Sequence, residues 1–295
     1  MNLQFTKMEG CGNDYVYVDG MRYDIRDEDK PDLVRRLSDR HFGVGGDGVI
    51  FINRSPIADF EMEMYNADGS RAEMCGNGIR CVGKYVYDHG YTDRTKITVE
   101  SFGSVKDLTL FVREGKVKSV EVDMGPAILE ADRIPVIISG EETEPISLAS
   151  GRIEKPVISL PVTVGGKEWP VTCVSMGNPH AVVFVDDTDA LDLTSIGPEF
   201  EHHPRFPKRI NTEFVEVIDR GHVKMRVWER GTGETLACGT GCCAICAACV
   251  LLDRTENDIL VDVLGGQLRI RWDQENNRIR MTGPAVEVFE GTIEI

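Results

Sequence analysis

Residues 71–90, RAEMCGNGIRCVGKYVYDHG, guide the interpretation of the whole chain, because residues 234–253, ETLACGTGCCAICAACVLLD, repeat their pattern. Each segment contains a Cys-Gly-x-Gly motif, which begins at Cys75 in the first segment and at Cys238 in the second. Each motif follows a polar turn and leads into a run with the composition of a helix. The repeat therefore predicts two halves that fold alike, each with a cysteine at the start of a helix.

The repeat continues on both sides of the two motifs at an offset of 162 to 165 residues. Gly12-Asn13 and the YVYVD that follows resemble Gly177-Asn178 and the later AVVFVD, and residues 97–103 resemble residues 259–265. Two equivalent halves of this kind would bring their matching loops face to face across a pseudo-twofold axis. We therefore expect a cleft between the halves that contains both thiols.

Local patterns indicate many short strands and few helices. Alternating residues between Gly, Asn and Asp turns predict strands, for example at 14–19, 60–65 and 222–228. Helical composition predicts helices at 31–40, 79–89 and 242–253, and the last should be buried because it is apolar on all sides until its final residue. The expected fold class is α+β, with two pseudo-symmetric domains that each form a curved, mostly antiparallel, barrel-like sheet around a central helix.

The composition disfavours several classes of function. The chain has 41% hydrophobic and 28% charged residues, as ordinary globular proteins do, and a formal charge of -16. That charge repels nucleic acid and anionic lipid, and no dense run of Lys or Arg offsets it. The N-terminus has no basic segment followed by an apolar one, so we expect a cytoplasmic protein without nucleic-acid or membrane partners. Nine cysteines without the spacing of a secreted framework indicate reduced thiols.

The two Cys-Gly-x-Gly motifs suggest proton transfer. A thiol at a helix N-terminus lies near the positive end of the helix dipole and near unpaired N–H groups, and both favour the thiolate. The glycines in each motif leave the backbone open to a substrate carboxylate. With one thiol on each face of a carbon, one removes a proton while the other supplies one, which inverts the centre without an electron-sink cofactor. The alternative is that both cysteines are small buried residues with a structural role.

Several longer motifs resemble those of diaminopimelate epimerases, within the wider group of proline racemases and phenazine-biosynthesis isomerases. They cover essentially the whole chain and are residues 7–14 (KMEGCGND), 65–70 (YNADGS), 74–78 (MCGNG), 176–180 (MGNPH), 205–211 (RFPKRIN) and 229–241 (ERGTGETLACGTG). The resemblance implies interconversion of LL- and meso-2,6-diaminopimelate, in lysine and cell-wall precursor synthesis, without pyridoxal phosphate or metal. It also implies a homodimer and a last strand that returns to the first domain, which gives domains 1–121 with 284–295 and 122–283.

The resemblance further implies a role for each matching residue. Cys75 and Cys238 would be the two acid/base catalysts, and His180 and Glu229 would lie near the thiols and tune or orient them. The distal amino-acid end of the substrate would be bound by Asn13, Asn66, Asn178, Asn211, Glu229 and Arg230. The reacting carboxylate would be bound by Gly76, Asn77, Gly239 and Thr240. Some members of the family have Gln where this chain has Gly48, so one side-chain contact to the substrate is absent here.

Residues 43–48, GVGGDG, fit a dinucleotide-binding GxGxxG string. The string follows a predicted helix and leads into a predicted strand at 49–52, which is the reverse of the order that dinucleotide binding requires. We therefore expect this loop to end the helix and shape the cleft, and we expect no nucleotide.

Cys243, Cys246 and Cys249 have the spacing of part of a zinc or iron–sulfur site. The residues between them are Ala, Ile and Ala, with no Gly or Pro to form a turn. A continuous buried helix is the better interpretation, so we expect no metal. The sequence does not assign a role to these cysteines, to Cys242 or to Cys11.

Three other functions share part of this pattern. A proline or hydroxyproline racemase uses the same thiol pair with a smaller pocket, and it has no need of distal acid and amide groups such as Asn66, Asn211, Glu229 and Arg230. A phenazine-type isomerase lacks the paired cysteines, and a non-catalytic binding protein would bind a small ligand without proton exchange. If the two thiols face each other, oxidation should join them in a disulfide and stop the enzyme.

Overall fold

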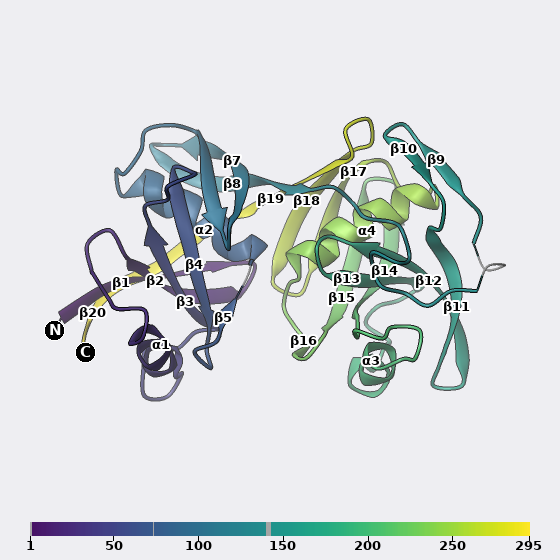
Figure 1. Ribbon diagram of the computed structural model, residues 1–295, viewed down its shortest axis with the longest axis horizontal. Coiled ribbons are helices and arrows are strands. Elements are labelled where there is room, and N and C mark those ends of the chain that lie inside the picture. The colour runs from purple at the N-terminus through teal and green to yellow at the C-terminus, as the bar shows by residue number, and fades with distance from the viewer. Residues whose placement is uncertain (1, 73, 140–142) are drawn as a thin grey trace. The chain divides into compact units, whose positions relative to one another are not determined.

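The computed structural model describes residues 2–72, 74–139 and 143–295 (Figure 1). The chain divides into two compact units, Met1–Asp123 with Thr282–Ile295 and Met124–Met281. The first unit is therefore built from both ends of the chain, and the second from its middle. In the described residues, no helix is long and apolar enough to cross a membrane.

The first unit combines strands from both ends of the chain with two helices. Its elements are β1 (Asn2–Gly10), β2 (Asn13–Asp19), α1 (Lys30–Ser38), β3 (Gly48–Asn53), β4 (Phe60–Asn66), β5 (Arg71–Ala72), α2 (Gly76–Asp88), β6 (Lys96–Ser101), β7 (Ser104–Arg113), β8 (Lys116–Gly125) and β20 (Val286–Glu294). β1 pairs with β20 and β2, and the pairing continues through β3, β4, β6 and β7 to β8. The β2–β3 and β4–β6 pairs are parallel, and the others in this series are antiparallel.

The second unit is built from the middle of the chain. Its elements are β9 (Ile146–Leu148), β10 (Gly151–Ile153), β11 (Val157–Val164), β12 (Lys167–Ser175), β13 (Pro179–Phe184), α3 (Leu193–Glu201), β14 (Asn211–Asp219), β15 (His222–Glu229), β16 (Gly233–Glu234), α4 (Gly239–Leu251), β17 (Asp258–Val263), β18 (Gly266–Asp273) and β19 (Arg278–Pro284). β11 to β15 pair in sequence order, and β15 then pairs with β17, which pairs with β18. The β13–β14 and β15–β17 pairs are parallel.

From β1 to β7 and from β12 to β18, the two units repeat the same order of elements and pairings. In each unit both helices connect the two strands of a parallel pair, because a helix between two neighbouring strands returns the chain in the same direction. The short strands β5 and β16 pair with β4 and β15 in the same way. The structure thus confirms the expected α+β class with two pseudo-symmetric, mostly antiparallel halves.

The second helix of each unit, α2 or α4, packs against an equivalent set of strands. α2 packs against β1, β2, β6 and β7, and α4 packs against the equivalent strands β12, β13, β17 and β18 (Figure 1). Residues 241–249 of α4 are all buried, which confirms that an all-apolar helix belongs in the core. Burying these helices fixes their N-termini, and the two Cys-Gly-x-Gly motifs lie at those N-termini.

The structure also corrects the predicted helices. α2 and α4 begin at Gly76 and Gly239, three residues earlier than predicted, because the first N–H groups of a helix need no acceptor within it and the glycines can adopt helical angles. α3 was not predicted, since Gly197 and Pro198 lie inside it. Gly197 is needed there because a Cβ would come within 2.3 Å of the Trp228 ring.

Candidate active site

Cys75 is the N-cap residue of α2. Its Sγ accepts a hydrogen bond from the Gly78 N–H at 3.3 Å and donates one to Asn13 Oδ1 at 3.1 Å. Asn13 is held in turn by Asp47, whose Oδ2 accepts from Asn13 Nδ2 at 2.7 Å. The thiol is half-buried. The first unit thus holds Asn13 directly beside the cysteine that caps α2.

Cys238 is the N-cap residue of α4 and is 5% exposed. Burial raises the pKa of its thiol well above the usual value, and the carboxylates of Glu229 and Glu213 raise it further. The Thr240 hydroxyl, 3.5 Å from Sγ, and the Gly241 N–H lower the pKa by less. The Gly241 N–H at the helix start thus favours the thiolate as expected, but burial and the two carboxylates outweigh it, so Cys238 is a thiol near neutral pH.

A chain of hydrogen bonds leads to Cys238 within the second unit. Glu213 Oε1 lies 2.7 Å from His180 Nδ1, and His180 Nε2 lies 3.0 Å from Asn178 Oδ1. Asn178 Nδ2 donates to Thr240 Oγ1 at 3.2 Å, and that hydroxyl contacts the Cys238 thiol. His180 and Glu213 are both fully buried. The chain therefore ties β13 and β14 to the first turn of α4.

Glu229, the last residue of β15, lies on another side of the same thiol. Its Oε1 accepts a hydrogen bond from Thr235 Oγ1 at 2.5 Å, and its carboxylate also bonds to Cys238. Burial raises the pKa of Glu229, and these two hydrogen bonds oppose the rise. Glu229 also raises the pKa of the Cys238 thiol, so the two side chains influence each other's protonation.

Asn211 and Arg230 form a second contact between strand ends in this unit. Asn211 is buried, its Nδ2 donates to the Pro179 carbonyl at 2.9 Å, and its Oδ1 accepts from the Arg230 N–H at 2.9 Å. The Arg230 guanidinium donates to the Lys208 carbonyl at 3.0 Å. The Asn211 side chain therefore holds the start of β13, and the Arg230 side chain holds the segment before β14.

The remaining sequence-predicted residues lie around the loops themselves. Asn66 is exposed and donates to Ser70 Oγ at 3.0 Å. Asn77 is buried, and its Oδ1 accepts from Arg80 Nη2 at 2.9 Å. A substrate carboxylate near α2 would therefore meet the backbone of Asn77. Gly76 and Gly239 are the first residues of α2 and α4.

Gly48 lies at the start of β3, after the loop that follows α1, as the sequence predicted. A Cβ at Gly48 would come within 2.0 Å of the Tyr65 carbonyl oxygen. A glutamine at this position is therefore incompatible with the observed backbone.

Sequence reasoning missed Glu213. The residue lies two positions after Asn211 on β14, so alternation places both side chains on the same face of the strand. A charged residue in a buried strand is itself a signal, because Glu is almost never fully buried without a partner. The signal was present in the sequence, but its partner is a residue 33 positions away.

Sequence reasoning also missed Tyr15. Strand pairing places Tyr15 opposite Gly48 in the first unit and His180 opposite Asn211 in the second, so Tyr15 and His180 are equivalent positions. Burial raises the pKa of Tyr15, and the neighbouring Cys75 raises it further. Applying the repeat offset residue by residue would have identified this pair.

Within the described residues, the nine cysteines are reduced rather than joined in disulfides. Cys243, Cys246 and Cys249 lie inside α4 and are fully buried, as the helical interpretation requires. One potential ligand atom from each of His180, Glu213 and Cys238 lies within 4.8 Å of the other two, a spacing that a metal ion could bridge. Both ring nitrogens of this histidine are in hydrogen bonds and the thiol is protonated, so a metal would have to displace one of these bonds and ionise the thiol.

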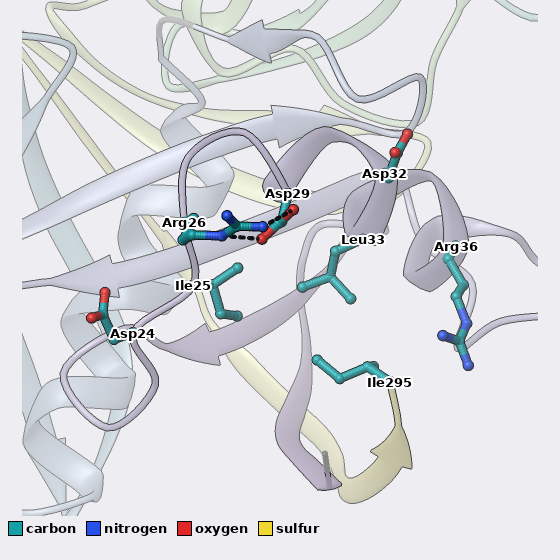
Figure 2. A pocket seen from close by; sticks show the side chains of 8 residues that line it. All are labelled: Asp24, Ile25, Arg26, Asp29, Asp32, Leu33, Arg36 and Ile295. Carbon is teal, nitrogen blue, oxygen red and sulfur yellow. Dashed lines mark hydrogen bonds and ion pairs between the residues drawn. The ribbon is translucent and has the colours of Figure 1, made fainter.

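A surface pocket of about 510 Å³ lies beside α1 in the first unit (Figure 2). Ile25, Leu33 and Ile295 line its apolar part, and Arg26 and Asp29 form an ion pair beside them. The pocket contains none of the sequence-predicted site residues. Neither cysteine loop contributes to it.

The family model and the full-length relatives point to the same protein family. The family model described as diaminopimelate epimerase matches residues 5–130 and 172–288. The chain is 54% identical over 293 residues to a diaminopimelate epimerase of Agathobacter rectalis, with 99% of this chain and 100% of that protein covered. It is 49% identical over 293 residues to one of Methanococcus maripaludis, with the same coverage.

Solved structures show the same fold at low sequence identity. A phenazine biosynthesis protein of the PhzF family from Bacillus anthracis matches over 100% of both chains with a TM-score of 0.70 and 18% identity. A hydroxyproline epimerase from Agrobacterium vitis matches over 99% of this chain and 91% of that chain with a TM-score of 0.62 and 14% identity. These likenesses establish the fold, and the full-length relatives establish the family. The chain belongs to the diaminopimelate epimerase family.

Proposed function

We propose that this protein is an isomerase that interconverts LL- and meso-2,6-diaminopimelate by a two-cysteine acid/base mechanism. The observation that carries the proposal is that each unit places a cysteine at the N-cap of the equivalent helix, Cys75 on α2 and Cys238 on α4. The full-length relatives named diaminopimelate epimerase support the substrate and a place in lysine biosynthesis.

The proposed reaction needs the two loops to face each other across the bound substrate. One thiolate removes the proton on the α-carbon, and the other thiol delivers a proton to the opposite face, so the centre inverts and the two cysteines exchange protonation states. The N–H groups at the starts of α2 and α4 would bind the carboxylate and stabilise the charge that develops on it. We assign that role to Gly76, Asn77, Gly239 and Thr240.

The electrostatics of the second unit support a starting state for this reaction. Burial and two carboxylates keep Cys238 protonated, so it begins as the acid. Cys75 would then be the base for the isomer whose α-proton faces the first unit. After one turnover the roles are reversed, and the opposite isomer completes the cycle.

The distal end of the substrate carries an ammonium and a carboxylate. We propose that Asn13, Asn66, Asn178, Asn211, Glu229 and Arg230 form its binding site, because amides, an acid and a base match those two charges. The hydrogen bonds that these side chains make in the structure would have to be shared with or yielded to the substrate.

Proton NMR of LL-diaminopimelate in heavy water tests the proposal. The reduced protein should exchange the α-proton and form the meso isomer, whereas Cys75→Ala and Cys238→Ala should lose roughly 10³-fold or more of that activity. L-Proline should be unchanged. Inversion of proline would favour the racemase alternative, and binding of diaminopimelate without any exchange would leave only a binding protein.

We also propose a cytoplasmic homodimer. Three apolar side chains on β20, Val286, Val288 and Phe289, are between 41% and 54% exposed, and burying them against a second copy would be favourable. Sedimentation of the protein and of a Val288→Lys, Phe289→Lys variant tests this. A monomeric wild type would contradict the homodimer.

A further inference from the structure

Glu213 is a fully buried carboxylate that the proposed mechanism does not use. Its Oε1 lies 2.7 Å from His180 Nδ1, and in the described part of the chain its Oε2 has no hydrogen-bond partner. A buried carboxylate with one bonded oxygen is costly, since an unpaired charge in the interior costs several kcal/mol. The contact with His180 therefore has to compensate for most of that cost.

The first unit shows that the fold does not require a carboxylate at this place. Strand pairing aligns Ile50 opposite Tyr17 with Glu213 opposite Val182, so Ile50 is the residue equivalent to Glu213. A Cβ at Gly78 would lie 2.7 Å from the end of Ile50, and a Cβ at Gly241 would lie 2.6 Å from Glu213 Oε1. An aliphatic residue thus occupies the same position under the Cys75 loop.

Glu213 is also the far end of the hydrogen-bond chain that reaches Cys238. The chain runs through His180, Asn178 and Thr240, with heavy-atom separations of 2.7, 3.0, 3.2 and 3.5 Å. A histidine fixed at one ring nitrogen presents the other in a set direction. The direction of the His180 ring then determines how the Asn178 amide and the Thr240 hydroxyl are oriented.

We propose that Glu213 is a positioning residue for the Cys238 half of the site. It holds His180 so that Asn178 and Thr240 are oriented toward the thiol, and its charge sits beneath that thiol. The groups that face Cys238 are Glu213 from β14, His180 from β13, Glu229 from β15 and Thr240 from α4. The inference rests on the proposed function, because it assigns a role within the same proton transfer.

Two substitutions separate the effect of the Glu213 charge from the effect of the length of its side chain. Glu213→Gln keeps the length and removes the charge, so we expect kcat to fall roughly 10- to 100-fold with KM changed less than about threefold. Because the carboxylate raises the pKa of Cys238, its removal should shift the Cys238 limb of the pH profile of kcat/KM to lower pH by about half a unit or more.

Glu213→Asp keeps the charge but is one methylene too short to contact the ring nitrogen. We expect a similar fall in kcat with the Cys238 limb of the pH profile close to its wild-type position. Glu216→Gln is the matched control, since Glu216 lies on the same strand and accepts hydrogen bonds from Thr188. This control should keep the wild-type kcat and pH profile.

A third variant covers the case in which the first two do not fold. Glu213→Ile copies the residue that the first unit carries at the equivalent position, and circular dichroism and thermal unfolding would verify its fold. We expect a folded protein with kcat lowered at least as much as in Glu213→Gln.

The outcomes separate this inference from the proposed function. Wild-type kcat and an unshifted pH profile in folded Glu213→Gln, or wild-type kcat in folded Glu213→Ile, would overturn the positioning role while the epimerase assignment stands. An inactive wild-type protein would instead overturn the proposed function, and the inference with it.

Discussion

Cys75 and Cys238 cap equivalent helices, but the residues around them differ in charge. In the first unit the contacts that the structure describes at the Cys75 thiol are with the Asn13 amide and the Gly78 N–H. In the second unit the carboxylates of Glu229 and Glu213 raise the pKa of Cys238. Strand pairing and the repeat give the equivalent pairs Tyr15 and His180, Ile50 and Glu213, Asn66 and Glu229, and Gly78 and Gly241. The same backbone therefore supports two different electrostatic environments.

The difference also extends into the two helices. α2 carries Arg80 and Lys84 in buried positions, where Arg80 donates to backbone carbonyls and Lys84 pairs with Asp88 at 2.6 Å. α4 carries cysteines, alanines and other apolar residues throughout its buried part. The comparison teaches that topology fixes where the two thiols lie within their units, while Glu229 and Glu213, which differ from their counterparts in the repeat, raise the pKa of Cys238.

The largest expected effect comes from making the first unit resemble the second. Ile50→Glu would bury a carboxylate where no histidine stands, since Tyr15 occupies the position of His180. We expect a loss of about 3 to 5 kcal/mol in the free energy of unfolding. Chemical unfolding measures this loss. Ile50→Leu is the control, and it should lower the free energy of unfolding by less than about 1.5 kcal/mol. Equal stability of the two variants would contradict the comparison.

A smaller effect is expected from adding one methyl group to each loop. In Gly241→Ala the new Cβ meets the Glu213 carboxylate, which is held by His180, whereas in Gly78→Ala it meets the flexible end of Ile50. We expect kcat to fall roughly 10- to 100-fold in Gly241→Ala and several times less in Gly78→Ala, because only the second contact relaxes cheaply. Steady-state kinetics measure both variants. Equal effects would show that the two loops are equally rigid, and a reversed order would contradict the comparison.

The reactivity of the two thiols provides a direct test of their difference. Cys75 is half-buried, whereas Cys238 is 5% exposed with a raised pKa, and only the thiolate reacts with alkylating agents. At pH 8 we expect iodoacetamide to modify Cys75 at least about tenfold faster than Cys238. Peptide mapping by mass spectrometry measures both rates, with each alanine variant as the control for assignment. Faster modification of Cys238 would refute the electrostatic asymmetry.

The smallest effect concerns Cys249 in α4, whose counterpart in α2 is Val86. Burial raises the pKa of Cys249 to about 12, so the folded protein keeps a proton that the unfolded chain loses near pH 8.5. This contribution to stability is present below pH 8.5 and is lost as pH rises toward 12. The stability advantage of wild type over Cys249→Ala should shrink by about 1 kcal/mol between pH 8.5 and 9.5. Chemical unfolding at both pH values measures this difference in the free energy of unfolding between the two proteins. A difference that does not change with pH would contradict the raised pKa of Cys249.

The repeat in the sequence predicted the fold, whereas the sequence predicted the candidate site only in part. Strands and buried helices were predictable because period and apolar content are local properties, and the repeat extended them to the whole topology. α3 escaped prediction because Gly197 and Pro198 are unfavourable in a helix, and the packing of Gly197 against Trp228 compensates for them. Local propensity could not include a partner that lies 31 residues further along the chain.

The site divides in the same way. Cys75 and Cys238 were identifiable as helix N-caps from their motifs, and both cap a helix in the structure. The raised pKa of Cys238 could not be predicted from the sequence. The helix dipole is a local property that a motif reveals, whereas burial and the nearby carboxylates of Glu229 and Glu213 arise from three-dimensional packing.

By itself the sequence determined the α+β class, the two equivalent halves, the two capping cysteines and the family. Each of these follows from order along the chain, which a repeat or a motif preserves. Only the tertiary structure decided that Glu213 and Ile50 lie beneath the two cysteine loops, next to Gly241 and Gly78. It also decided that His180 is held between Glu213 and Asn178. The physical reason is that pKa values and hydrogen-bond chains depend on distance and burial, and folding sets both between residues that are far apart in sequence.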